Sequence, residues 1–254
     1  VDGEWERVLA LLAEMRLAKI DRNLVVYGAA ISACERCLQW QHAVLLLDSL
    51  VLDHLEPNTV VHSAAITACS RSQHWELALL LLQGARRRPG LLNVVTYSAA
   101  ISACEAAQKW ELVLHLLAEA SGQRIDLDVV AYGSAISACE GSGQWSLALQ
   151  FLREMHRDSL EANMIAYNAA LSACGKAGQV EEVSRLLKLV EQNRACPDVL
   201  TYKAAVCAGE ISCQSVWAVG LLEGARASTD SHLSELRHGT MQDASFGVAG
   251  VDLL

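Results

Sequence analysis

Aromatic residues and proline are both scarce in this sequence: the aromatic content is 5% and there are three prolines. So few bulky side chains give little material for one large globular core. Charged residues are also few, at 19%, whereas hydrophobic residues reach 52% and the mean hydropathy is +0.23, a composition that excludes a disordered chain. No apolar run approaches the roughly eighteen residues of a membrane helix, and no basic, cleavable leader opens the sequence. The sequence therefore predicts no membrane partner.

Basic charge is also lacking, because the net charge is -9. Such a charge repels nucleic acid and anionic lipid at long range and argues against non-specific binding to either. Catalytic motifs are lacking as well: there is no H-E-x-x-H pair, no nucleophile elbow and no phosphate-binding loop. The sequence predicts a protein that is not an enzyme, and no cofactor.

What the sequence does contain is an internal repeat of 35 residues without insertions. It is seen by aligning the segments NLVVYGAAISAC at 23, NTVVHSAAITAC at 58, NVVTYSAAISAC at 93, DVVAYGSAISAC at 128, NMIAYNAALSAC at 163 and DVLTYKAAVCAG at 198. Tryptophan recurs in the same phase and each time opens a second segment, at Trp5, Trp40, Trp75, Trp110 and Trp145.

Both segments of the unit have helical patterns. The first places small or apolar residues three and four apart, as at Ala30, Ile31 and Cys34, and it follows an Asn or Asp that can cap a helix. We expect paired helices near 24–36 and 40–52, recurring every 35 residues to about 190. One hairpin cannot bury its own apolar faces, so neighbouring hairpins must stack. The fold class predicted is an all-α superhelix, an α-solenoid of helix-turn-helix repeats.

The 35-residue unit, with "VTY" at Val95–Tyr97 and the stretch from Tyr167 to Asp198, resembles the pentatricopeptide repeat, a family of organellar RNA-binding proteins. In the family's register the complete units are 24–58, 59–93, 94–128, 129–163 and 164–198. A degenerate sixth unit covers 199–233. Residues 1–23 match only the second helix of a further unit, and residues 234–254 are expected to form a weakly ordered tail. The resemblance implies a chloroplast or mitochondrial location.

The resemblance also implies a role for particular positions, because these arrays recognise single-stranded RNA one base per repeat. The fifth and last residues of each unit would contact the base edge: Gly28 with Asn58, Ser63 with Asn93, Ser98 with Asp128, Gly133 with Asn163, and Asn168 with Asp198. The second residue would pack on the base: Val25, Val60, Val95, Val130 and Ile165. A basic thirteenth residue would approach phosphate: Arg36, Arg71 and Lys176. The family's pairings imply the sequence 5′-nAGnU-3′, where n marks the two glycine units.

Each assignment has a simpler alternative. The last residues stand where a helix needs an N-cap, and capping alone would explain all of them. The second-position residues could be ordinary packing residues, and the three basic residues could be surface charges. For the function as a whole, the alternative is a protein-binding solenoid without RNA affinity. The net charge favours that alternative, as do the acidic residues Glu35, Glu105 and Glu140, which directly precede the phosphate position.

Nine cysteines raise the question of a metal or redox site. Five of them recur once per repeat, at Cys34, Cys69, Cys104, Cys139 and Cys174. Equivalent residues on stacked helices lie about 8–10 Å apart, which is too far for a disulfide. The pair Cys34 and Cys37 has no second pair at zinc-ribbon spacing. The recurring cysteines are therefore predicted to fill the core, with no metal bound.

Overall fold

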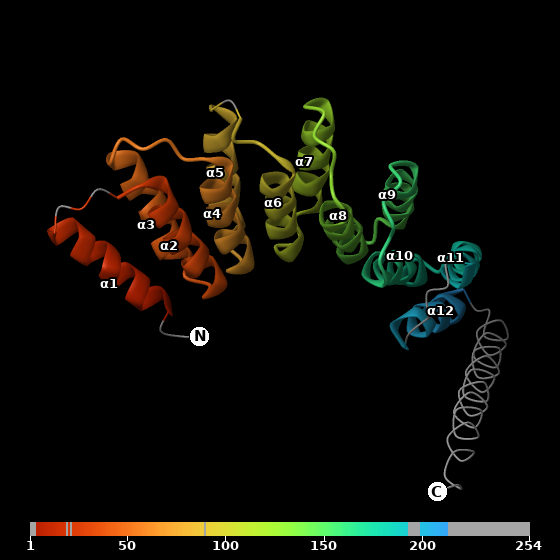
Figure 1. The fold of residues 1–254 in the computed structure, drawn as a ribbon. Helices are drawn as coiled ribbons and strands as arrows, with labels where there is room; N and C mark the ends of the chain where they lie inside the picture. The colour runs from red at the N-terminus through yellow and green to blue at the C-terminus, as the bar shows by residue number, and fades with distance from the viewer. Residues whose placement is uncertain (1–3, 19, 21, 89, 193–198, 213–254) are drawn as a thin grey trace, which may run out of the picture. The chain divides into compact units, whose positions relative to one another are not determined.

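The computed structural model describes residues 4–18, 20, 22–88, 90–192 and 199–212, and every regular element in these ranges is an α-helix (Figure 1). The first helices of the hairpins are α2 (Leu24–Arg36), α4 (Thr59–Arg71), α6 (Val94–Ala106), α8 (Val129–Ser142), α10 (Met164–Lys176) and α12 (Val199–Ile211). The second helices are α1 (Glu4–Leu17), α3 (Trp40–Leu52), α5 (Trp75–Arg86), α7 (Trp110–Gly122), α9 (Trp145–Arg157) and α11 (Val180–Gln192). The predicted helix pairs and their 35-residue spacing are confirmed.

The chain divides into two compact units, residues 1–173 and 174–254. In the first unit the first helices α2, α4, α6 and α8 pack side by side in sequence order. Each of α3, α5 and α7 packs on the first helix of its own hairpin and on that of the next. In the second unit α11 packs against α12. Contacts between successive hairpins are the arrangement expected of a solenoid. No helix in the described ranges is long and apolar enough to cross a membrane.

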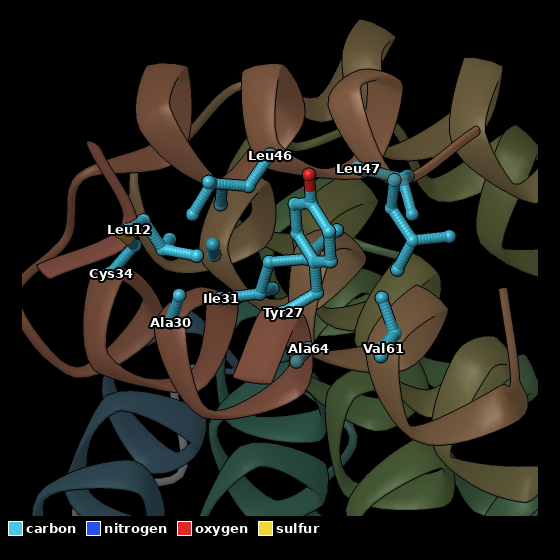
Figure 2. Close-up of a cluster of buried hydrophobic side chains, with 13 residues drawn as sticks. Leu12, Tyr27, Ala30, Ile31, Cys34, Leu46, Leu47, Val61 and Ala64 are labelled. Carbon is cyan, nitrogen blue, oxygen red and sulfur yellow. The ribbon is translucent and has the colours of Figure 1, made fainter. Parts of the chain in front are cut away.

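Small side chains make the contact between successive first helices. Figure 2 shows this core around Tyr27, where Ala30 and Ile31 of α2 lie near Leu46 and Leu47 of α3. The core continues into the next repeat, through Val61 and Ala64 of α4. The alanine at the position of Ala30 is fully buried in each complete repeat: Ala30, Ala65, Ala100, Ala135 and Ala170. Alanine at this position brings the helix backbones close together.

The five recurring cysteines lie in this core, as predicted. Cys34, Cys69, Cys104, Cys139 and Cys174 are buried and none forms a disulfide. Burial raises the pKa of the Cys69, Cys104 and Cys139 thiols to about 11, so these thiols stay protonated at neutral pH. In the described ranges no group of three or more His, Cys, Asp or Glu side chains could hold a metal ion.

The turn between the two helices of each hairpin contains one residue with a positive φ, in the left-handed region. After α2, the amide of Gln39 donates to the carbonyl of Cys34 at 2.9 Å, and Leu38 between them has φ 58°. Gln73 and Gln108 repeat this geometry at φ 63° and 57°, whereas the fourth and fifth repeats use Gly143 and Gly178. Glycine adopts positive φ without the steric cost that a Cβ atom adds.

A tyrosine and a carboxylate join the two helices of a hairpin in three repeats. The hydroxyl of Tyr27 donates to Asp53 Oδ2 at 2.6 Å, and that of Tyr132 donates to Asp158 Oδ2 at 2.8 Å. In the third repeat Tyr97 donates to Glu119. An arginine pairs with each carboxylate: Arg22 with Asp53, Arg86 with Glu119, and Arg157 with Asp158. We call each set a tyrosine clamp; it satisfies the polar end of a buried aromatic side chain.

The turn geometry predicts that Gln73→Gly stabilises the protein. Relief of the positive φ should raise the free energy of unfolding by about 0.5–1 kcal/mol, measured by urea denaturation. The matched control is Gln144→Gly, because Gln144 has φ -86° and gains no such relief. Equal effects of the two substitutions would contradict the strain argument.

The clamp predicts that Tyr132→Phe lowers the free energy of unfolding by about 1 kcal/mol at pH 7, since one hydrogen bond is lost. Burial, and then the bond to Asp158, raise the pKa of Tyr132 from 10.0 to about 12. Because the pKa is higher in the folded state, the stabilisation is complete below about pH 10 and is lost as the pH rises towards 12. Denaturation at several pH values should therefore show a shallower alkaline decline for Tyr132→Phe than for the parent chain.

Candidate functional site

An exposed row of branched apolar side chains marks one face of the first helices. The second residue of each unit is exposed: Val25 by 76%, Val60 by 62%, Val95 by 52%, Val130 by 58% and Ile165 by 69%. These residues are not packing residues of the core, so that alternative is wrong for them. We call the surface made by these residues, the fifth residues of the units and the last residues Asn58, Asn93, Asp128 and Asn163 the first-helix face. Because the same position is exposed and apolar in five successive repeats, these side chains are available to contact a repeating ligand.

The fifth and last residues of the third repeat lie in direct contact. Ser98 Oγ is 2.8 Å from Asp128 Oδ1 and 2.8 Å from the carbonyl of Val94. Asp128 also caps α8, because its Oδ1 accepts the amide of Ala131 at 2.9 Å. The single hydroxyl proton of Ser98 is thus held by the protein, and Asp128 keeps Oδ2 as an acceptor. The remaining hydrogen-bonding capacity of the pair is therefore acceptor only, on Ser98, which is buried, and on Asp128, which is partly exposed.

The second repeat presents a different chemistry at the same positions. Ser63 Oγ donates to the carbonyl of Val60 at 3.0 Å. Asn93 and Thr96 form a capping box, in which Asn93 Oδ1 accepts the amide of Thr96 at 2.9 Å. With its oxygen used by the helix, the amide group of Asn93 has its two N–H donors to offer. The pair therefore keeps a hydroxyl acceptor on Ser63, which is buried, and amide donors on Asn93, which is partly exposed.

In the first and fourth repeats the fifth residue is glycine, so the last residue has no side chain there to pair with. A Cβ atom at Gly28 would lie 3.5 Å from Val61 Cγ2, and one at Gly133 would meet nothing within 4 Å. Asn58 Oδ1 accepts the amide of Val61, and Asn163 Oδ1 accepts that of Ala166, both at 2.9 Å. Capping by the last residue is therefore confirmed at Asn58, Asn93, Asp128 and Asn163.

The fifth repeat is described only in part. Asn168 is half-buried on α10, whereas its expected companion Asp198 lies outside the described residues. Residues 1–3 and 213–254, which contain the predicted tail and most of the sixth unit, also lie outside them. The second helix expected in residues 1–23 is present as α1, and the sixth unit begins with α12.

The three basic residues proposed for phosphate contact end first helices and are exposed. Arg36 ends α2, Arg71 ends α4, and Lys176 ends α10 in the second unit. The side chain of Arg71 pairs with Glu35 of the preceding repeat at 4.0 Å and is still 51% exposed. Burial raises the pKa of Glu105, and the charge of Glu140 raises it further. Glu35 thus lies beside Arg71, and Glu105 and Glu140 add negative charge at the ends of their first helices, as the sequence indicated.

Hydroxyl contacts between repeats were not predicted from the sequence. Ser102 Oγ lies 2.8 Å from Ser134 Oγ across the third and fourth repeats. Ser172 Oγ donates to Glu140 Oε1 at 2.7 Å across the fourth and fifth. The recurrence of a hydroxyl at Ser32, Thr67, Ser102, Ser137 and Ser172 is the signal that could have pointed to them.

Together these features define an α-solenoid repeat protein with one exposed apolar residue in each complete repeat, polar pairs in the second and third repeats, and a polar last residue without a pair in the first and fourth. The pairs differ in donor and acceptor character from repeat to repeat. A surface with that organisation can distinguish the units of a linear polymer.

Comparison with known proteins supports the resemblance to the pentatricopeptide repeat family. Residues 115–177 and 150–208 match a pentatricopeptide repeat domain. The chain also matches the crystal structure of the pentatricopeptide repeat protein PPR10 from maize, with 26% identity and a TM-score of 0.61 over 88% of this chain. The chain thus resembles pentatricopeptide repeat proteins in sequence within residues 115–208 and in fold over most of its length, as the sequence pattern indicated. It spans 32% of the maize chain, about a third of its length. A comparison with curated protein sequences finds no match.

Two further structures share the fold. PPR10 in complex with an 18-nt psaJ RNA element matches 89% of this chain and 32% of its own, with 21% identity and a TM-score of 0.62. The pentatricopeptide repeat domain of Arabidopsis thaliana protein-only RNase P 1, in complex with tRNA, matches 74% of this chain and 98% of its own, with 12% identity and a TM-score of 0.66.

The capping geometry predicts that Asn93→Ala lowers the free energy of unfolding by about 1 kcal/mol, because the start of α6 loses its cap. Asn93→Asp should cost little, since a carboxylate oxygen can accept the same amide. Thermal unfolding monitored by circular dichroism checks both. If Asn93→Ala unfolded at the same temperature as Asn93→Asp, the cap would contribute no stability and the prediction would be wrong.

Proposed function

We propose that this chain binds single-stranded RNA in a sequence-dependent way, with one base facing each repeat on the first-helix face. The observation that carries the proposal is the contact between Ser98 and Asp128, since it joins the two positions that the family uses to recognise a base. The RNA complexes of the solved relatives support it, because those proteins share this fold.

The third repeat suits guanine. Its pair offers lone pairs only, on Ser98 and on Asp128 Oδ2, because the serine proton is already engaged. The Watson-Crick edge of guanine carries two neighbouring donors, N1–H and the N2 amino group. Adenine carries an acceptor at N1, which would face the carboxylate without a proton between them. Unpaired buried acceptors cost free energy, so adenine is disfavoured here.

The second repeat suits adenine by the same reasoning. The amide donor of Asn93 matches the acceptor N1 of adenine, and the hydroxyl oxygen of Ser63 matches its N6 amino donor. Val60 and Val95 are exposed beside these pairs, where each can cover the face of a base. The two repeats thus differ in base preference because their last residues differ, with Ser as the fifth residue in both.

Across five repeats the proposed sequence is 5′-nAGnU-3′, with uracil facing Asn168 and Asp198. The proposed setting is RNA processing, stability or editing in a chloroplast or mitochondrion, and the proposed action is binding rather than catalysis. Arg36, Arg71 and Lys176 would contact phosphates. Such contacts strengthen binding without selecting a sequence.

A protein-binding scaffold is the second candidate, favoured by the acidic residues of the first helices. Glu35 already pairs with Arg71, and Glu105 and Glu140 lie close enough for the charge of one to raise the pKa of the other. RNA phosphates approaching this face would meet those carboxylates. A partner protein with a basic surface would not be repelled.

Selection from randomised RNA tests the two candidates. At low salt the parent chain should enrich A and G at neighbouring positions, with U two positions after the G. Asn93→Asp should move the preference of the second repeat from A to G, because the amide donor becomes an acceptor. Since aspartate keeps the cap, the change in preference should come without a loss of stability.

Arg71→Ala is the matched control for that experiment. Removal of a phosphate contact should weaken binding to all RNA sequences alike and leave the selected sequence unchanged. No enrichment at any position, with the chain folded by circular dichroism, would instead favour the protein-binding scaffold.

A further inference from the structure

The turn between the two helices of a hairpin lies beside the end of the next first helix. Ser72, directly after α4, donates its hydroxyl to the carbonyl of Leu38, in the turn of the preceding hairpin, at 3.2 Å. Arg71, the phosphate position of the second unit, is the residue before Ser72. The turn of one repeat is therefore close to the phosphate position of the next, which is the thirteenth residue of the unit.

Gln108, in the turn of the third repeat, fills the place of a side chain on Gly141. Gly141 is the thirteenth residue of the fourth unit, and a Cβ atom on it would overlap the amide of Gln108, with Gln108 Cδ only 2.8 Å away. Both residues are exposed. Gln108 Nε2 donates to the carbonyl of Glu105 at 3.3 Å, which leaves its second N–H for a ligand. An amide of the third repeat thus lies where a basic side chain would begin in the fourth.

The type of turn residue is complementary to the type of residue at the phosphate position 33 residues later. Taken in order along the sequence, the turn residue and the phosphate position are Leu38 with Arg71, Gln73 with Ala106, Gln108 with Gly141, and Gly143 with Lys176. Glutamine precedes a phosphate position without charge, whereas a residue with no polar side chain precedes a basic one. The sequence therefore supplies one polar side chain from either source.

The backbone of these turns does not need glutamine. Gln73 and Gln108 have φ of 63° and 57°, where a Cβ atom is unfavourable, and the fourth and fifth repeats make the same turn with Gly143 and Gly178. Residues held in such conformations cluster at ligand-binding sites. The turn gains no conformational advantage from the two glutamine side chains, so their benefit lies in what the amides contact.

A neutral donor suits this part of the first helices. Glu105 and Glu140 directly precede the phosphate positions of the third and fourth units, and the charge of Glu140 raises the pKa of Glu105. An arginine beside them would pair with a carboxylate, as Arg71 pairs with Glu35 at 4.0 Å. A glutamine amide forms no ion pair, and its N–H groups can still donate to a phosphate oxygen.

We propose that the side-chain amides of Gln73 and Gln108 donate hydrogen bonds to RNA phosphates at the third and fourth repeats, whose phosphate positions have no basic residue. This inference rests on the proposed function, because it requires an RNA strand along the first helices. The two amides add affinity without selecting a sequence. The phosphate contacts of the five complete repeats are then those of Arg36, Arg71, Gln73, Gln108 and Lys176.

Gln73→Gly, Gln108→Gly and the double variant test these contacts. The probe is a single-stranded RNA that carries the proposed core with adenine at both n positions. Each single substitution should raise the dissociation constant about 3–10-fold, and the double variant should show the product of the two effects. The loss should be equal on polyuridine of the same length, because a phosphate contact is independent of the base. Circular dichroism checks that each variant is folded.

Leu38→Gly is the matched control. Leu38 has φ 58° at the equivalent turn, so the substitution relieves the same backbone strain and removes no hydrogen-bonding side chain. Its RNA affinity should equal that of the parent. Salt dependence gives a second readout. Gln108→Gly should leave the slope of log affinity against log salt unchanged, because a neutral amide displaces no counterion, whereas Arg71→Ala should make the slope shallower by about 0.7.

Equal dissociation constants for the parent, Leu38→Gly and both glutamine variants would overturn this inference and leave the proposed function standing. A parent chain that binds RNA without sequence preference would refute the proposed base recognition, and the glutamine variants would still decide the phosphate contacts. A folded parent chain that binds no RNA at low salt would overturn both.

Discussion

Close approach of consecutive first helices is the constraint on which the rest of this structure depends. Fully buried alanine at one position of every complete repeat, from Ala30 to Ala170, lets α2, α4, α6 and α8 lie side by side. That spacing brings the start of each first helix next to its predecessor. It is the reason that Asp128, at the start of α8, can reach Ser98 on α6. A larger residue at the alanine position would separate the pair as well as weaken the core.

The same geometry gives the last residue of each repeat two roles that do not conflict. Helix capping uses one oxygen of Asn93 or Asp128 and thereby fixes what remains for a ligand: an amide donor in one case and a carboxylate oxygen in the other. The alternative that these residues are caps is correct, and it supports their proposed role in recognition. The helix orients the side chain, and the choice of Asn or Asp sets its chemistry.

Much of the fold could be predicted from the sequence, because the repeat fixes both the period and the phase of the helices. Asn or Asp before each first helix marked its start, and the structure confirms the caps at Asn58 and Asp128. The exposure of Val25 and its equivalents was also predictable, since a β-branched residue recurs where the pattern does not need one in the core. These features depend on local sequence alone.

The remaining features depend on distances between repeats, which a pattern does not contain. The resemblance paired Ser98 with Asp128, but the hydrogen bond between the two side chains and the engagement of the serine proton by the protein are seen only in the structure. In two of the three tyrosine clamps the carboxylate, Asp53 or Asp158, lies 26 positions after its tyrosine, and this shared offset was a signal in the sequence that was not used. In the third, Glu119 lies 22 positions after Tyr97. In the second repeat the sequence has His62 at the tyrosine position and Arg88 at the position of Asp53 and Asp158, so this repeat has no such clamp. The structure adds that His62 Nδ1 is buried without a hydrogen-bond partner among the described residues.

The buried cysteines give each complete repeat its own chemical reporter. Because Cys34, Cys69, Cys104, Cys139 and Cys174 are at most 1% exposed and their pKa values are about 11 or 12, a thiol reagent reaches each sulfur only when its repeat opens. The order in which the five sulfurs are labelled therefore ranks the repeats by the free energy of local opening. The 35-residue period thus puts one buried cysteine, usable as a probe of local opening, in every complete repeat.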